Sequence, residues 1–501
     1  MSKFLAGALA FVLITAVIWV SVLWHWESTR HDMSVSDIAI YLAVLPLTCF
    51  ALALALRWAW RGAGKRHAAA AAAQAAAAAA PAGGAAGSAD AATDDARRHA
   101  TTLLLGAWLC SAAGSSPEDL MDAAKAGEPR PALDAELRDD EGMPLMAARI
   151  PDLDTGELEE AAQPLVGAVV AQQSEWRGMA PGAQVWRALA ALQAPLVSAV
   201  DAIQPWSDRF APPEAAPGTH PNGPRPPVRL VRLLVGLPEA WHAFERGVAQ
   251  AWITQLVAEH SKEVAPASFR TEIVATSGPE LVLKADQLLQ ALARESRDDL
   301  LLLAACHSDL SEVAVAALDN ARRLFTTSAN PKGVMPGEAA AALLLAQPGW
   351  PPAPHDEAPF AHLHRPAVLR RDKSIEAPGK VSSDLVLHGC TQAFTASQID
   401  AAQVKALVCD ADQHTARSTE LFGATLALLP ELDPSEDMRV LGTVTGHTGA
   451  ASTLAVIAAA AAQAMSLEAP CAAVSLADPF FRLALIARPD APAAPASAAT
   501  A

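Results

Sequence analysis

The sequence predicts a layered α/β body that is preceded by two membrane-spanning helices. The first observation is a pair of long apolar runs near the N-terminus, Phe4–Leu23 and residues 38–56, neither of which contains a charged residue. The second is that, beyond residue 100, short apolar runs alternate with alanine-rich segments. Strands separated by helices are typical of a layered α/β fold.

Each N-terminal run is long enough to cross a bilayer. About 20 residues at a rise of 1.5 Å span a hydrocarbon core of roughly 30 Å. Trp24 and Trp26 follow the first run, and Trp58 and Trp60 follow the second, where tryptophan prefers the membrane interface. No small-residue cleavage site follows the first run, so the sequence favours a retained anchor over residues 1–61.

The positive charges predict the orientation of this anchor. Arg57, Arg61, Lys65 and Arg66 follow the second run, and Lys3 precedes the first. The positive-inside rule then places both ends, and with them the body, in the cytoplasm of a bacterium at its inner membrane. Neither run holds a charge that would mark an ion path, so we expect anchoring and not transport.

Composition divides the remainder of the chain. Residues 62–100 are rich in alanine and glycine and predict a semi-flexible linker. Residues 101–347 form a first half of the body and residues 381–489 a second half, separated by a proline-rich loop over 348–380. The Ala/Pro-rich tail 490–501 is expected to be disordered.

Six apolar runs carry the strand prediction. They are Thr102–Trp108, Val228–Val235, Leu300–Ala305, Ala339–Leu345, Ala406–Cys409 and Ala472–Leu476. A helix is expected over Leu281–Ala293, and another after Gly449.

Charge and cysteine usage exclude several functions. A net charge of −17 and a pI near 5.2 offer no electrostatic surface for nucleic acid. The cysteines lie mostly inside apolar runs without CxxC spacing, which argues against disulfides and zinc sites. They are Cys49, Cys110, Cys306, Cys390, Cys409 and Cys471. His355, His362 and His364 lie in the proline-rich loop and are interpreted as solvated loop residues, so neither metal nor cofactor is expected.

Two motifs resemble the β-ketoacyl synthases of the thiolase-like superfamily. Residues 331–340 read PKGVMPGEAA before AALLL, similar to the family's glycine turn and glutamate that lead into a central strand. Residues 446–452 read GHTGAAS before an alanine-rich helix, similar to the family's Gly-His loop. Gly337 predicts a close backbone approach. The resemblance covers about residues 101–488 and implies a layered αβαβα thiolase-like body.

The chain departs from the family at the residues that carry condensation. The family's cysteine nucleophile is replaced in the stretch Ala275–Pro279, where Ser277 is nearest. The first histidine motif is replaced by the stretch Cys409–His414, in which Asp412 is nearest. The family's lysine is absent, and its final glycine turn is replaced by residues 475–480. His447 alone is retained, which implies a protein that does not condense acyl groups.

Ser277, Asp412 and His447 are therefore the candidate residues of a degenerate catalytic site. Each also has a structural interpretation. Ser277 is expected to cap the following helix, Asp412 and Asp410 to form turns, and His447 to bridge two loops.

These observations favour a membrane-anchored, non-catalytic adapter or binding protein with a protein partner. Its overall layout is similar to that of adapters that handle lipase effectors of the type VI secretion system, so an effector or a secretion component is one expected partner. An acyltransferase or condensing enzyme is the alternative. A partner of an active ketosynthase, resembling a chain-length factor, is another, and the resemblance also allows a homodimer through the body.

Overall fold

The computed structural model describes residues 98–210, 228–327, 329–352 and 361–490. The predicted membrane helices, the linker up to residue 97 and the C-terminal tail beyond residue 490 lie outside the described residues. Within the described part, only the helix Gly449–Leu467 is long and apolar enough to cross a membrane, and 72% of its apolar window is buried inside the protein. That helix is therefore the core helix of the body.

The described chain alternates strands and helices. The strands are β1 (Thr101–Ser111), β2 (Ala132–Arg138), β3 (Pro144–Ala147), β4 (Val231–Pro238), β5 (Phe269–Thr276), β6 (Leu300–Ser308), β7 (Glu338–Ala346), β8 (Ala361–His364), β9 (Ala367–Arg370), β10 (Ala406–Cys409), β11 (Met438–Val440), β12 (Cys471–Ser475) and β13 (Phe481–Pro489). The α-helices are α5 (Pro117–Ala126), α6 (Gly156–Val170), α7 (Ala183–Asp201), α8 (Ala243–His260), α9 (Pro279–Arg294), α10 (Glu312–Asn320), α11 (Asp384–Ser397), α12 (Thr415–Leu428), α13 (Gly442–Thr445) and α14 (Gly449–Leu467). All six predicted strands are present. Their first and last residues match the prediction or differ from it by a few positions.

One large sheet runs through the body. Its strand order is β11-β10-β12-β13-β8-β1-β7-β6-β4-β5, with β9 pairing to β13. The strands β4, β5 and β6 are parallel to one another, as are β10, β11 and β12. Strand β8 joins the two halves because it pairs with β1 on one side and with β13 on the other. The segment predicted as a proline-rich loop thus contains β8 and β9.

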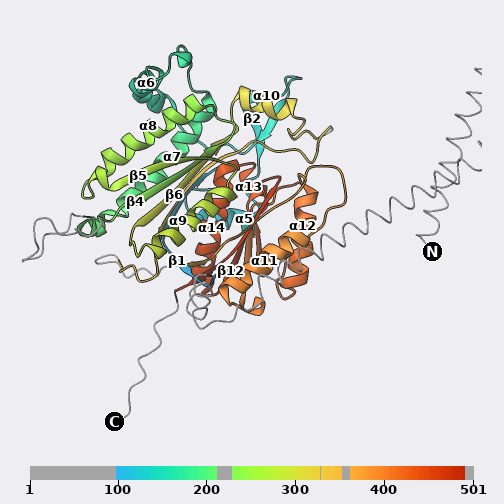
Figure 1. The fold of residues 1–501 in the computed structure, drawn as a ribbon. Coiled ribbons are helices and arrows are strands. Elements are labelled where there is room, and N and C mark those ends of the chain that lie inside the picture. Colours follow the sequence, from blue (N-terminus) through green and yellow to red (C-terminus); the bar gives the residue numbers. More distant parts are fainter. Residues whose placement is uncertain (1–97, 211–227, 328, 353–360, 491–501) are drawn as a thin grey trace, which may run out of the picture. The chain divides into compact units, whose positions relative to one another are not determined.

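Helices cover the two halves from outside and also fill the space between them (Figure 1). Helix α7 packs on β1, β6 and β7, and α8 packs on α7. On the other half, α11 packs on β13 and α12. Helix α14 contacts β6 and β7 of the first half as well as β12 and β13 of the second. The result is a mixed α/β fold with one large sheet and helices, which is consistent with the layered αβαβα body that the sequence predicts.

The central elements form because their residues tolerate burial on every side. Every residue of β7 is buried, and its sequence EAAAALLLA offers mainly small apolar side chains to both faces. A strand covered on both faces is typically apolar without alternation. Thirteen residues of α14 are buried, most of them alanine, which allows strands of both halves to approach it closely.

Candidate functional site

A polar cluster lies where β6 ends and where α14 begins. Seven apolar residues, Leu300 to Cys306, run through the core before His307, Ser308 and Asp309. The loop before α14 brings His447 to the same place, because the His447 amide donates to the Met335 carbonyl at 2.9 Å. The backbone of His447 thus joins the loop before α14 to the loop before β7.

Gly337 makes this approach possible. A Cβ atom at Gly337 would lie 2.4 Å from the Thr445 carbonyl oxygen and 3.1 Å from the His447 nitrogen. Real Cβ atoms do not come so close to a backbone oxygen, so only glycine fits. The close backbone approach predicted at Gly337 is confirmed.

Asp309 stands between two histidines. Its Oδ2 atom lies 2.6 Å from Nδ1 of His447, and its Oδ1 atom lies 3.0 Å from Nε2 of His307. The two imidazole rings are 5.1 Å apart and perpendicular. Three groups from two distant parts of the sequence therefore meet in one largely buried cluster, called the His-Asp-His cluster below.

The charge of Asp309 is set by its neighbours. Burial alone would raise the pKa of the carboxyl group, but His307 and His447 outweigh burial and hold this pKa far below its usual range. Asp309 is therefore ionised, and we assign the hydrogen of the 2.6 Å contact to Nδ1 of His447. The approach of His307 lacks the direction of a hydrogen bond, and neither of its ring nitrogens has a hydrogen-bond partner.

Glu338 fixes the strand ends beneath the cluster. This fully buried carboxylate accepts hydrogen bonds from Nε and Nη2 of Arg187 at 2.8 and 2.5 Å. It also accepts from the Ser308 hydroxyl at 3.0 Å and the Ile150 amide at 2.8 Å. Charge-assisted bonds of this kind are stronger than neutral ones, so Glu338 holds β6, β7 and α7 in register.

Ser277 lies on the turn between β5 and α9 and is half-buried. The prediction that it caps the helix is wrong, because Gly278 is the N-cap and no side chain caps the helix. Instead, the Thr276 hydroxyl accepts a hydrogen bond from the Gly278 amide at 3.0 Å. Gly278 has φ +127°, and a Cβ atom there would lie 2.6 Å from the Thr453 hydroxyl. The turn between β5 and α9 therefore requires glycine at position 278.

Asp412 has a structural partner of its own. Its carboxylate accepts from Nη1 of Arg417 at 3.0 Å and from the His414 amide at 2.9 Å. Its predicted role as a turn former fits these contacts. Among the described residues, no hydrogen bond or ion pair joins Asp412, Ser277 and His447 to one another.

Asp410 is not a turn former but the centre of a buried network. Its carboxylate accepts hydrogen bonds from the hydroxyls of Ser452 and Ser475 at 3.0 and 2.6 Å. It also accepts from the backbone amides of Leu476 and Ala477. Burial raises the pKa of this carboxyl group even though the hydrogen bonds oppose the shift. Two backbone donors of the 475–480 turn are therefore occupied by a side chain of the protein itself.

The thiols of the described residues are poor nucleophiles. Burial raises the pKa of Cys390 and Cys409 to about 12, and it raises the pKa of Cys306 and Cys471 further. For Cys110, burial and the nearby charge of Glu338 raise the pKa. Because the thiolate is the nucleophile, none of these five cysteines is activated.

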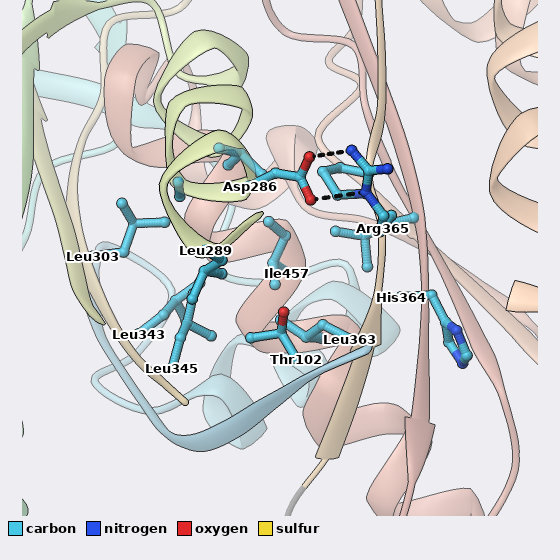
Figure 2. Close-up of a pocket in the computed structure, with 14 residues that line it drawn as sticks. Thr102, Asp286, Leu289, Leu303, Leu343, Leu345, Leu363, His364, Arg365 and Ile457 are labelled. Carbon is cyan, nitrogen blue, oxygen red and sulfur yellow. Dashed lines mark hydrogen bonds and ion pairs between the residues drawn. The ribbon is translucent and has the colours of Figure 1, made fainter. Parts of the chain in front are cut away.

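His362 and His364 are strand residues, which corrects their interpretation as solvated loop residues. Both lie in β8, and His364 is buried. His355 lies outside the described residues. Figure 2 shows His364 and Arg365 beside a small cavity under α9, where Arg365 pairs with Asp286 at 2.6 Å. The cavity volume is about 40 Å³, which is room for one or two water molecules.

No family model matches the sequence, and no curated protein matches it. Several solved structures resemble the fold. The ketosynthase from module 6 of the bacillaene synthase of Bacillus subtilis 168 is 13% identical and has a TM-score of 0.52, over 78% of this chain and 72% of that chain. A β-ketoacyl synthase from Burkholderia phymatum STM815 is 15% identical with a TM-score of 0.49, over 78% and 99%. The ishigamide ketosynthase/chain length factor is 17% identical with a TM-score of 0.47, over 77% and 99%. The bacillaene synthase match supports a thiolase-like, ketosynthase type of fold for the body.

Sequence reasoning found His447 but missed both of its partners. The available signal was a change from seven apolar residues to His307, Ser308 and Asp309 at a strand end. Polar residues that follow a buried parallel strand commonly lie at a functional edge. The contacts around Asp410 had no comparable signal in the sequence, because its partners are backbone amides and serines far along the chain.

Proposed function

We propose that this chain is a non-condensing protein of ketosynthase-like fold that binds a protein partner at the cytoplasmic face of a bacterial inner membrane. The observation that carries the non-condensing part is the Asp410 network. Condensation requires backbone donors for a developing oxyanion. Here the amides of Leu476 and Ala477 donate to a carboxylate of the protein, which would also repel a substrate oxyanion.

The cysteines and Ser277 support the same proposal. A condensing enzyme holds its acyl group on an activated nucleophile. The described thiols are kept protonated by burial, and among the described residues Ser277 makes no hydrogen bond to His447 or Asp412. A small cavity of about 40 Å³ under α9 would not accommodate an acyl chain.

An open groove between the β2–β3 hairpin and a facing segment is the proposed partner site. The facing segment contributes Asp319, residues 325–327 and Ala329. The volume of the groove is about 530 Å³. Leu133 and Met143 line it and expose 66% and 59% of their surface. Its acidic lining residues are Asp139, Asp140, Glu141 and Asp319. Apolar anchors surrounded by carboxylates favour a partner segment that combines apolar side chains with lysine or arginine.

The predicted membrane anchor suggests which kind of protein the partner is. A membrane-tethered binding protein of this layout suits a lipase effector or a component of the type VI secretion system, which is the adapter role expected from the sequence. The chain-length-factor-like alternative is favoured by one observation. Strand β5 lies at the end of the sheet order and pairs only with β4 among the described strands, so its free edge could pair with a ketosynthase-like subunit.

Site-specific cross-linking tests the groove. A photo-reactive residue replaces Met143 in the full chain in its native membrane, and cross-linked peptides are identified by mass spectrometry. We expect a partner segment that contains both apolar and basic residues. The double variant Asp140→Lys/Glu141→Lys should lower this cross-link at least tenfold, because it reverses the charge of the groove.

The double variant Glu157→Lys/Glu160→Lys is the matched control. It reverses the same number of charges at exposed positions of α6 and should leave the cross-link unchanged. Equal loss in both variants would contradict the groove as the binding site. A stable acyl adduct on Ser277, or on any cysteine, after treatment with a reactive thioester would contradict the non-condensing part. Cross-links to β5 instead of the groove would support the chain-length-factor-like alternative.

A further inference from the structure

The His-Asp-His cluster offers three ligand groups to one point. One ligand atom from each of His307, Asp309 and His447 can be chosen so that all three lie within 4.8 Å of one another. Two imidazoles and one carboxylate are the donor set of many three-ligand sites for transition metals. The sequence alone predicted no metal, because these residues lie 138 positions apart.

His307 provides an independent indication of a ligand. Only 8% of its surface is exposed, and both of its ring nitrogens are buried without a hydrogen-bond partner. A buried polar atom without a hydrogen-bond partner is unfavourable, because it has given up its hydrogen bonds to water. The Asp309 carboxylate lies 3.0 Å from Nε2 of His307 but without the direction of a hydrogen bond, so this nitrogen is available to a ligand.

Packing leaves one nitrogen of His307 for that ligand. A Cβ atom at Gly449 would lie 2.3 Å from Nδ1 of His307, so the start of α14 covers that side of the ring. The opposite nitrogen, Nε2, faces Asp309 at 3.0 Å. On the other side of Asp309, His447 presents Nδ1. The three candidate ligand atoms are therefore Nε2 of His307, a carboxylate oxygen of Asp309 and Nδ1 of His447.

The charge of the cluster suits a cation. The acidic group of the cluster is the Asp309 carboxylate, and among the described residues its side chain pairs with the two histidines. A bound cation would replace the hydrogen between His447 and Asp309, and neutral His447 would then carry its hydrogen on Nε2 instead of Nδ1.

We propose that His307, Asp309 and His447 form a binding site for a divalent transition-metal ion, with Zn²⁺ as the ion that fits best. Zinc sites with three protein ligands keep a fourth position for water or a substrate. The three side chains retain 11%, 13% and 19% exposure, so solvent reaches the cluster. Calcium and magnesium prefer all-oxygen ligands, and so the two imidazoles disfavour them. This inference is independent of partner binding in the groove, which lies among other residues.

Metal titration of the full chain, purified without a polyhistidine tag and stripped with a chelator, tests the site. Zn²⁺ is titrated in competition with a chromophoric chelator, and Co²⁺ absorption in the visible region reports ligand geometry. We expect one Zn²⁺ per chain and the strong visible bands of four-coordinate Co²⁺. His307→Gln, Asp309→Asn and His447→Gln should each weaken Zn²⁺ binding by about 100-fold or more, since even loss of an outer-shell partner weakens metal binding 10–100-fold.

The matched control is His388→Gln, which removes an exposed histidine of α11. It should leave the affinity unchanged. Circular dichroism of each variant shows whether it is folded, and Asp309→Asn retains the shape of the site if a histidine variant unfolds. The proposal is overturned if the wild-type chain takes up no Zn²⁺, or if folded Asp309→Asn binds Zn²⁺ as tightly as the wild type. If Fe²⁺ binds more tightly than the general affinity order predicts, the metal site is supported and Fe²⁺ replaces Zn²⁺ as the ion that fits best.

Discussion

Nδ1 of His447 donates a 2.6 Å hydrogen bond to Asp309, a residue 138 positions earlier in the sequence. His307 approaches the other oxygen of the same carboxylate at 3.0 Å. This carboxylate joins the C-terminal end of β6 to the start of α14. Its ionisation is therefore coupled to the stability of the body.

The first prediction concerns acid stability. The two histidines outweigh burial and hold the pKa of Asp309 in the folded protein well below its usual value. A lowered pKa stabilises the fold above the unfolded pKa, and this contribution is lost as the pH falls through the folded pKa. Asp309→Asn should therefore be less stable by about 1.5–3 kcal/mol at pH 7. Below about pH 4 its stability should depend less on pH than that of the wild type, as measured by urea unfolding in the absence of metal.

The second prediction concerns the backbone contact that positions His447. Gly337→Ala would place a Cβ atom 2.4 Å from the Thr445 carbonyl, and neither backbone segment can move freely. We expect a loss of about 1–3 kcal/mol or more and a lower thermal midpoint. Gly167→Ala is the control, because nothing lies within 4 Å of its Cβ position in α6. It should be neutral or stabilising, and an equal loss in both variants would contradict the argument.

The third prediction concerns a buried ion-pair network in the second half. Glu420 is fully buried between Arg371 and Arg482, with an Nε–Oε2 distance of 2.8 Å to Arg482. Glu420→Ala leaves two guanidinium groups without their carboxylate, so it should destabilise the fold by about 3–5 kcal/mol. Glu272→Ala removes an exposed partner of Lys284 and should cost at most about 1 kcal/mol. Chemical denaturation of both variants measures the difference.

The fourth prediction concerns His364 beside the cavity of Figure 2. Burial, with the positive charges of Arg488, His362 and His99, lowers the pKa of His364 to about 4. The unfolded chain then binds a proton near pH 6.5 that the folded chain does not, so stability falls between pH 6.5 and 4. Between pH 6.5 and 4, His364→Leu should lose up to about 3 kcal/mol less free energy of unfolding than the wild type. The exposed control His388→Leu should retain the wild-type slope in denaturation measured at several pH values.

The sequence by itself determined the elements whose residues carry local information. The continuous apolar run before Cys306, the alanine-rich strand after Glu338 and the small residues after Gly449 predict β6, β7 and α14, because burial on all sides requires such residues. The close approach at Gly337 was also predictable, since only glycine permits it. The same local reasoning identified His447 as a bridge between loops.

Only the tertiary structure decided which polar groups meet. Asp309 and His447 are brought together by the packing of β6 against α14, and Asp410 reaches the amides of residues 476 and 477 because β10 and β12 are neighbours. Such contacts depend on sheet order and not on spacing along the chain. For the same reason His307 emerged as a member of the site, whereas Ser277 and Asp412 make no hydrogen bond with His447 among the described residues.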